Sequence, residues 1–400
     1  MVPRSDLLDA AHAVQPRTVA LRRTLHRHPE LGLDLPRTRD AVVAELADLP
    51  LRVHLGSSVS SVVAVLDGDR PGPTVLLRGD MDALPLDEDT GLSFASRVEG
   101  AMHACGHDTH TAMLASAARL LAGRRSELAG RVLFMFQPGE EGFHGARYML
   151  EEGLLDADGP AGRPDAAYAL HISATLPSGE VQTRPGPAMA AADVVSVVVT
   201  GRGGHASAPH DALDPLPAAA AMVGALQTAV TRRIDTHDAV VLTISHITAG
   251  TTNNIIPETV HMEGTLRTFT AAARARMHEE ITRVCTHVAL AHGCTAEVTI
   301  HPGYPVTVND PGAADRVIDI AADVLGADRV ADMATPIMGA EDFSYVLAEI
   351  PGAMSFLGGA HPGADLAAIA PNHSNRVVFD EGALPSGVAL YAALALYGAH

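Results

Sequence analysis

One short segment of the chain gathers side chains that can bind metal ions. The stretch 103–110 contains one cysteine and three histidines. Cys105 and His107 are two residues apart, and Gly106 between them lets the backbone bend, so their side chains can converge on one or two metals. Sulfur and imidazole ligands favour zinc and similar ions. A buried cysteine among surface histidines is the alternative, but packing alone does not require four such residues so close together.

Pairs of carboxylates follow two segments that we expect to be strands. Asp80 and Asp82 come after one strand, and Glu140 and Glu141 lie between glycines after another. Catalytic groups in open α/β sheets collect at the carboxyl ends of strands. Adjacent glutamates repel each other unless a cation or a proton lies between them. One glutamate bound to a metal and the other free as a base would resolve this conflict, although either pair could be a solvated acidic turn.

Two single histidines could complete a metal site. His171 ends a further expected strand, and His373 follows Pro371 and Asn372 near the C-terminus. Each of them, taken alone, is equally consistent with a structural role.

A second group of candidates lies in the middle of the chain. His205 sits in a Gly-rich turn, where glycine freedom suggests a close approach or a moving loop. Asn254 adds an amide, and Arg267 adds a guanidinium that could bind a carboxylate through two hydrogen bonds. A plain surface turn and an ordinary strand-surface charge are the alternatives.

Alternating strands and helices must position the first group. We expect helices over most of residues 1–50 and at 109–121 and 146–153, and strands at 61–66, 74–77, 131–137 and 166–171. This alternation indicates an α/β sheet with helices on its faces.

From about Arg184 the pattern changes to β-α-β-β-α-β, which is typical of a ferredoxin-like fold. The expected strands are 193–200, 239–246, 255–269 and 294–301. Asp214, followed by Pro215, is expected to cap one helix, and Thr270 is expected to cap the other.

The α/β pattern then resumes, with a helix at 312–325, a strand at 354–357 and a terminal helix from about 382. Glu341 and Asp342 are expected in the first turn of a helix. We therefore expect one domain, residues 1–183 and 305–400, interrupted by a second domain, residues 184–304.

The composition excludes several classes of function. The chain has 28 basic and 47 acidic residues, so its net charge is 28 − 47 = −19, which disfavours nucleic acids and anionic membrane surfaces as partners. No apolar run reaches the ~18 residues of a membrane helix, and the N-terminus lacks a secretory signal. We expect a cytoplasmic protein in which Cys285 and Cys294 are buried thiols.

Taken in order, the motifs resemble those of the M20 metallopeptidases, and most closely the amidohydrolase branch of that family. The branch includes hippurate hydrolases, indole-acetyl-amino-acid hydrolases and related N-acyl amino acid amidohydrolases. The motifs that carry the resemblance are LHRHPELG, RGDMDALP, HACGHD, QPGEEG, LH, GRGGHASAPH, NNIIPE, GTLRTF and GAEDF. Together they extend from about His26 to Glu381.

The resemblance implies a zinc-exopeptidase-like catalytic domain, a mixed sheet with helices on both faces. It also implies two divalent metals per subunit, with Zn or Mn expected and Co or Ni as alternatives. The positions that match the family's metal ligands are Cys105, His107, Glu141, His171 and His373. Glu140 matches the general acid/base, and Asp82 matches the carboxylate that orients the chemistry at the metals. In the wider family a histidine ligand stands at the position of Asp80.

The inserted segment matches the family's lid and dimerisation domain, which implies a homodimer or a tetramer. His205 matches a residue that reaches the partner's active site and stabilises the tetrahedral intermediate. Asn254 and Arg267 match positions that hold the substrate's carboxylate. The chain departs from the family after its last ligand, because Ser374 and Asn375 stand where a proline is frequent two residues after His373.

These roles predict metal-dependent hydrolysis of N-acyl amino acids. Glu140 would take a proton from a metal-activated water and then protonate the leaving amine. A dipeptidase or carboxypeptidase is the alternative within the same chemistry. Two further alternatives are disfavoured. A metal-binding protein without activity would have no need of Glu140. An ester or thioester hydrolase with Cys105 as its nucleophile would carry that residue on a sharp strand-to-helix turn, and the sequence around Cys105 does not have the pattern of such a turn.

Overall fold

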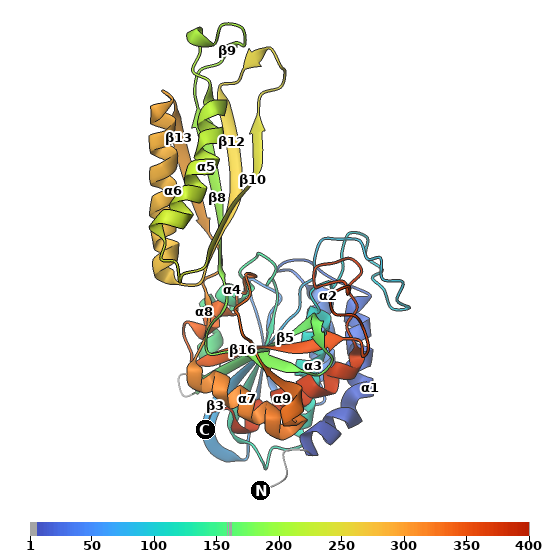
Figure 1. Cartoon of the computed structure of the whole chain (residues 1–400). Helices are drawn as coiled ribbons and strands as arrows, with labels where there is room; N and C mark the ends of the chain where they lie inside the picture. Colours follow the sequence, from blue (N-terminus) through green and yellow to red (C-terminus); the bar gives the residue numbers. More distant parts are fainter. Residues whose placement is uncertain (1–5, 158, 160–161, 400) are drawn as a thin grey trace. The chain divides into compact units, whose positions relative to one another are not determined.

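The computed structural model describes residues 6–157, 159 and 162–399 (Figure 1). The chain forms two compact units. The first consists of Met1–Ala188, Val308–Thr335 and Asp342–His400, and the second consists of Met189–Thr307 and Pro336–Glu341. Within the described ranges, every helix is too short or too polar to cross a membrane.

The first unit is built on an eight-stranded mixed sheet with the strand order β1-β2-β4-β3-β5-β16-β6-β15. Its strands are β1 (Arg52–Leu55), β2 (Val62–Asp67), β3 (Arg70–Asp80), β4 (Ala129–Gln137), β5 (Ala166–Pro177), β6 (Val181–Thr183), β15 (Val330–Asp332) and β16 (Gly352–Ala360). The central strands β4, β3, β5 and β16 run parallel. They are rich in apolar residues and buried along most of their length, as expected for strands covered on both faces. A separate pair is formed by β7 (Gly186–Met189) and β14 (Thr307–Asn309).

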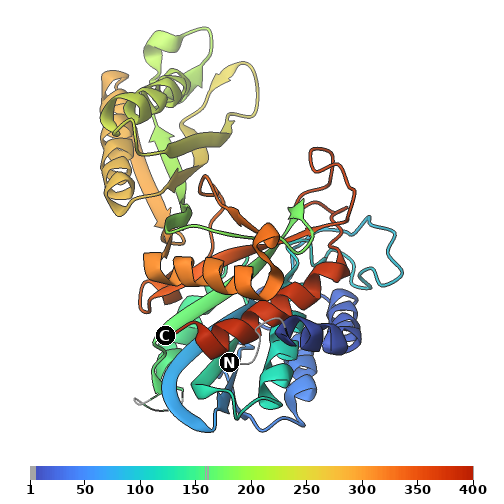
Figure 2. The same cartoon turned by 60° about the horizontal axis from the view of Figure 1, so that its bottom comes forward.

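Helices cover this sheet. They are α1 (Asp6–His26), α2 (Pro36–Leu46), α3 (His107–Ala122), α4 (Gly145–Glu151), α7 (Pro311–Leu325), α8 (Ser344–Leu347) and α9 (Leu384–Tyr397). Helix α9 is apolar on all sides and almost wholly buried, because it contacts α1, α3 and α7 as well as the sheet. Figure 2 shows α7 in orange and α9 in red, side by side over the strands.

The second unit is a four-stranded antiparallel sheet with two helices. The strands are β8 (Ala191–Thr200), β10 (Val240–Ala249), β12 (Thr259–Thr268) and β13 (Thr295–Pro302), in the order β10-β12-β8-β13. The helices are α5 (Pro215–Arg233) and α6 (Ala271–Ala291). This is the ferredoxin-like order, so the predicted fold class, a mixed α/β sheet with a ferredoxin-like insertion, is confirmed. A two-stranded pair, β9 (Gly204–His205) and β11 (Ile255–Ile256), extends from one end of this sheet (Figure 1).

Local sequence signals explain the two helices of this unit. The Asp214 side chain accepts a hydrogen bond from the N–H of Leu216, and the Thr270 hydroxyl accepts one from the N–H of Ala273. Both caps are where the sequence predicts them. Cys285 and Cys294 are free and buried, as expected.

Two predictions about elements are wrong. The expected strand 255–269 is divided into β11 and β12, because Pro257 between them has no N–H to give to a neighbouring strand. Asp342 does not lie in the first turn of a helix, since α8 begins only at Ser344. The Asp342 carboxylate instead accepts a hydrogen bond from the N–H of Ala146 at the start of α4.

Candidate active site

The turn that carries Cys105 and His107 depends on a glycine. Gly106 has a φ of 90°, a left-handed conformation, and it precedes the first residue of α3, His107. A Cβ atom on Gly106 would lie 2.4 Å from Cγ2 of Ile172. Only glycine combines this backbone conformation with so close an approach. The turn therefore brings Cys105 and the start of α3 against the middle of β5, which continues to Pro177, past the predicted strand end at His171.

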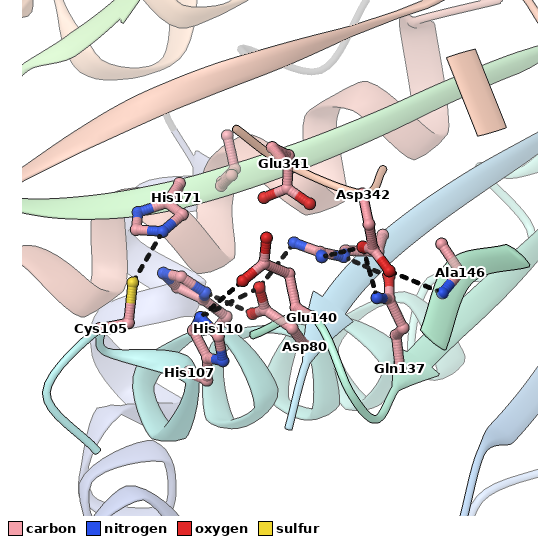
Figure 3. A network of polar contacts seen from close by, with 12 residues as sticks. Asp80, Cys105, His107, His110, Gln137, Glu140, Ala146, His171, Glu341 and Asp342 are labelled. Atoms are coloured by element: carbon pink, nitrogen blue, oxygen red, sulfur yellow. Dashed lines mark hydrogen bonds and ion pairs between the residues drawn. The ribbon is translucent and has the colours of Figure 1, made fainter. Parts of the chain in front are cut away.

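Cys105 lies beside His171 (Figure 3), the histidine predicted on β5. Its Sγ atom is 3.3 Å from Nε2 of His171. The other ring nitrogen, Nδ1, donates to the carbonyl oxygen of Ile172 at 2.8 Å, which leaves the lone pair of Nε2 pointing at the sulfur. Burial lowers the pKa of His171 well below its ordinary value, so the ring is the neutral imidazole that binds metals. Cys105, His107 and His171 form a group whose ligand atoms lie within 4.8 Å of one another.

Cys105 also belongs to a second group of potential ligands. Its Sγ atom is 3.2 Å from Nε2 of His373, and that nitrogen is 3.4 Å from Oε1 of Glu141. Hydrogen bonds to Cys105 and Glu141 raise the pKa of His373 to about 10. The structure thus brings together all five predicted ligands in two groups that share one sulfur atom.

The chemistry of these side chains fits metal ions. The ring nitrogens of His107 and Oε1 of Glu141 are buried, and none of these atoms makes a short hydrogen bond among the described residues. Their ion-pair contacts are long: Nδ1 of His107 is 3.3 Å from Oδ1 of Asp82, Nε2 of His107 is 3.4 Å from Oδ2 of Asp80, and Oε1 of Glu141 is 3.4 Å from Nε2 of His373. Such contacts offset only part of the cost of burying a polar atom, which is about 1–3 kcal/mol. Burial also raises the pKa of the Cys105 thiol, so a thiolate there requires a nearby cation. Bound divalent cations would satisfy both requirements.

Asp82 fixes the turn that carries the two glutamates. Its two carboxylate oxygens accept hydrogen bonds from the backbone N–H groups of Glu140 and Glu141, at 3.0 and 2.9 Å. Oδ1 of Asp82 is also 3.3 Å from Nδ1 of His107. Glu140 is buried, and its Oε2 lies 4.0 Å from Nε2 of His107. Asp82 therefore ties the predicted base to the predicted ligands through backbone contacts.

His110 supports the site in a way that the sequence does not predict (Figure 3). Its Nδ1 lies 2.5 Å from Oδ1 of Asp80, and its Nε2 accepts the backbone N–H of Ile172 at 2.7 Å. Because Nε2 is an acceptor, Nδ1 carries the proton, and both nitrogens are in use. His110 consequently cannot serve as a ligand in this arrangement. It connects Asp80 to the strand segment that carries His171.

A buried network extends from Asp80 to the distant Asp342. Arg78 lies 2.7 Å from Oδ2 of Asp80 and donates to Oε1 of Gln137 at 2.8 Å. Gln137 in turn donates to Oδ1 of Asp342 at 2.6 Å (Figure 3). Although burial disfavours the charged form of Asp80, the cation of Arg78 lowers the pKa of this carboxyl well below its usual range. Arg78 thus supplies a fixed positive charge behind the predicted ligands.

Within the inserted unit, His205 and Asn254 lie close together, and Arg267 lies apart from them. His205 on β9 pairs with Ile255 on β11, and the N–H of Ala206 donates to the carbonyl oxygen of Asn254. His205 and Asn254 are exposed and lie beyond Thr200, the last residue of β8. Arg267 pairs with Ala192, at the opposite end of β8. At ~3.3 Å per residue, these ends of the strand are roughly 25 Å apart.

The chain is similar to known proteins over most of its length. Residues 76–397 match the model of peptidase family M20/M25/M40. Thermostable carboxypeptidase 1 of Saccharolobus solfataricus is 37% identical over 94% of both chains. N-acetylcysteine deacetylase of Bacillus subtilis is 38% identical over 78% of this chain and 81% of its own. IAA-amino acid hydrolase ILR1-like 2 of Arabidopsis thaliana is 36% identical over 94% of this chain and 84% of its own.

Solved structures are similar over the whole chain. A putative aminohydrolase from methicillin-resistant Staphylococcus aureus has a TM-score of 0.89 at 32% identity, covering 98% of both chains. The YXEP protein of Bacillus subtilis, described as a dinuclear metal-binding peptidase, has a TM-score of 0.82 at 34% identity and covers 96% of this chain and 98% of its own.

Proposed function

Because the chain belongs to peptidase family M20/M25/M40, in its amidohydrolase branch, we propose that it hydrolyses the amide bond of N-acyl amino acids. The products are a carboxylic acid and a free amino acid. The names of relatives at 36–38% identity, an N-acetylcysteine deacetylase and an IAA-amino acid hydrolase, support this substrate class.

The observation that carries the proposal is the pair of ligand groups that share Cys105, with Glu140 beside them. One group is Cys105, His107 and His171, and the other adds Glu141 and His373 to the same sulfur. This arrangement supports two divalent metals per subunit, with Zn or Mn expected and Co or Ni as alternatives.

When bound, the metals would supply the Lewis acidity that makes water acidic near neutral pH and polarises the amide carbonyl. Glu140 then takes the proton from the attacking water and delivers it to the leaving nitrogen. Its buried position near His107 keeps bulk water from competing for that proton. Asp82 holds the Glu140 backbone, so the carboxylate keeps its place through both transfers.

The roles proposed for the inserted unit are stabilisation of the tetrahedral intermediate by His205 and binding of the substrate carboxylate by Asn254 and Arg267. His205 and Arg267 are separated by roughly 25 Å along β8, which is longer than a small N-acyl amino acid. One chain therefore cannot offer both residues to the same substrate. This separation supports a homodimer in which each active site takes residues from both subunits.

A carboxypeptidase or dipeptidase activity is the second candidate. It is favoured by the 37% identity to thermostable carboxypeptidase 1 over 94% of both chains. Both candidates use the same metals and the same base. They differ only in the acyl group that the cleaved amide bond joins to the nitrogen of the released amino acid.

A substrate panel separates these candidates. Metal-free protein is loaded with Zn, Mn or Co and assayed on N-acetyl and N-benzoyl amino acids, free dipeptides and longer peptides. We expect the highest kcat/KM on an N-acyl amino acid and loss of all activity on chelation. A preference for free dipeptides or longer peptides would favour the second candidate. Activity that survives complete metal removal would contradict both, and would point to Cys105 as a nucleophile.

A further inference from the structure

The side chain of Asn372 connects three segments that carry predicted ligands. Its Nδ2 donates to the carbonyl oxygen of Cys105 at 3.2 Å and to that of Ile172 at 2.9 Å. Its Oδ1 accepts the backbone N–H of Ala174 at 2.9 Å. A primary amide offers two donors and one acceptor oxygen. Asn372 therefore uses both of its donors and its acceptor on the backbone of Cys105 and of two residues within β5, Ile172 and Ala174.

The next residue, His373, needs such support more than the other histidine ligands do. His107 is the first residue of α3 and His171 lies within β5, so regular structure fixes both of their backbones. His373 lies in a loop, and 56% of its side chain is exposed. The side-chain contacts of His373 with Cys105 and Glu141 are those of the ligand group itself, so the position of its backbone must be set by other contacts.

The backbone of His373 is also strained. Its φ is 69°, the left-handed region that residues with a side chain rarely adopt. Such conformations are unfavourable and persist only where the surroundings impose them. Here the N–H of His373 donates to the carbonyl oxygen of Ala104 at 2.9 Å, and the hydrogen bonds of Asn372 hold the preceding residue.

We propose that Asn372 is a positioning residue that holds His373 against Cys105, and that it thereby sets the affinity of the metal bound by Cys105, Glu141 and His373. The proposal rests on the metal centre of the proposed function.

The test measures metal binding without substrate. Asn372→Leu keeps the approximate size of the side chain and removes all three hydrogen bonds. Asn372→Ser is a smaller polar variant that keeps the measurement possible if the leucine variant fails to fold. Asn375→Leu is the matched control, because Asn375 is an exposed asparagine of the same loop. Each metal-free protein is titrated with Zn²⁺ in competition with a chromophoric chelator, and with Co²⁺ to follow the thiolate-to-cobalt absorption of Cys105.

We expect wild-type protein and Asn375→Leu to bind two equivalents with the same affinities. In both Asn372 variants one of the two equivalents should bind about 10–100-fold more weakly, with a changed cobalt–thiolate band. Unchanged affinities in a folded Asn372 variant, even one with a lower unfolding temperature, would overturn the proposal and leave the proposed function intact. Failure of the wild-type protein to bind two equivalents would overturn both.

Discussion

His26 on α1 is a buried histidine between two carboxylates. Its Nδ1 is 2.8 Å from Oδ2 of Asp108, and its Nε2 is 3.2 Å from the carboxylate of Glu88. Arg22 also contacts Asp108, at 2.9 Å. Burial disfavours the charged form of His26, but the two carboxylates outweigh it and raise its pKa to about 9. The neighbouring His103 stays neutral, because burial lowers its pKa to about 3.

This shift predicts a pH-dependent stability. The pKa of His26 is higher in the folded protein than in the unfolded chain, so protonation stabilises the fold. The contribution is complete below the unfolded pKa of ~6.5 and is lost as the pH rises through about 9. Its size is on the order of 3 kcal/mol. Urea unfolding of metal-free protein between pH 6 and 9.5 measures it, with the non-titrating variant His26→Gln as the control. Equal slopes of the free energy of unfolding against pH in both proteins would refute the assignment to His26.

At the residue scale, the sequence indicated which side chains can bind metals but not how they are supported. Cys105 and His107 were predictable because their chemistry and spacing are local. His110 and Asn372 were not, since their roles consist of contacts with Asp80 and with the backbone of β5. Those partners are brought close only by the fold.

At the scale of elements, the site depends on the turn that joins Cys105 to α3. We predict that Gly106→Ala lowers both the stability and the metal affinity. The left-handed backbone costs an alanine about 1–2 kcal/mol, and the new Cβ would also collide with Ile172. Gly91→Ala is the matched control, because Gly91 has a φ of 70° and open space around its Cβ position.

Denaturant unfolding and metal titration of both variants check this prediction. In Gly91→Ala the free energy of unfolding should fall only by the cost of the left-handed backbone, and the metal affinity should stay at the wild-type value. If Gly106→Ala behaves like Gly91→Ala, the close approach to Ile172 does not position the ligands.

Elements with signals in their own sequence were predicted well. Helices α5 and α6 begin where Asp214 and Thr270 cap them, because a cap is a contact between near neighbours. The position of Asp342 was mispredicted for the opposite reason. Acidic residues before a short helix suggest a favourable helix dipole, but the carboxylate of Asp342 bonds to Gln137 and Ala146 from distant parts of the chain.

At the scale of the whole molecule, the order of strands and helices was enough to predict an α/β sheet with a ferredoxin-like insertion. The net charge of −19 says less about function, because the carboxylate of the proposed substrate would be bound by local charge at Arg267 and the metals. The proposed sharing of active sites between subunits is a property of an assembly and requires its own experiment.

Mixed dimers provide that experiment. One subunit carries His205→Ala and the other carries Glu140→Gln, so each homodimer lacks a component at both of its sites. If His205 acts across the interface, a mixed dimer has one intact site and should recover about half of the wild-type kcat per dimer. No recovery in dimers that are confirmed to be mixed would contradict action across the interface.

We propose that Glu140 acts as the base beside a two-metal cluster without being a ligand itself. The most direct measurement compares Glu140→Gln with Glu141→Gln for metal content and for hydrolysis of the best N-acyl amino acid. Glu140→Gln should keep two metals and lose at least about 100-fold in kcat, whereas Glu141→Gln should lose metal as well as activity. Near-normal turnover in Glu140→Gln, or loss of its metals, would contradict the account.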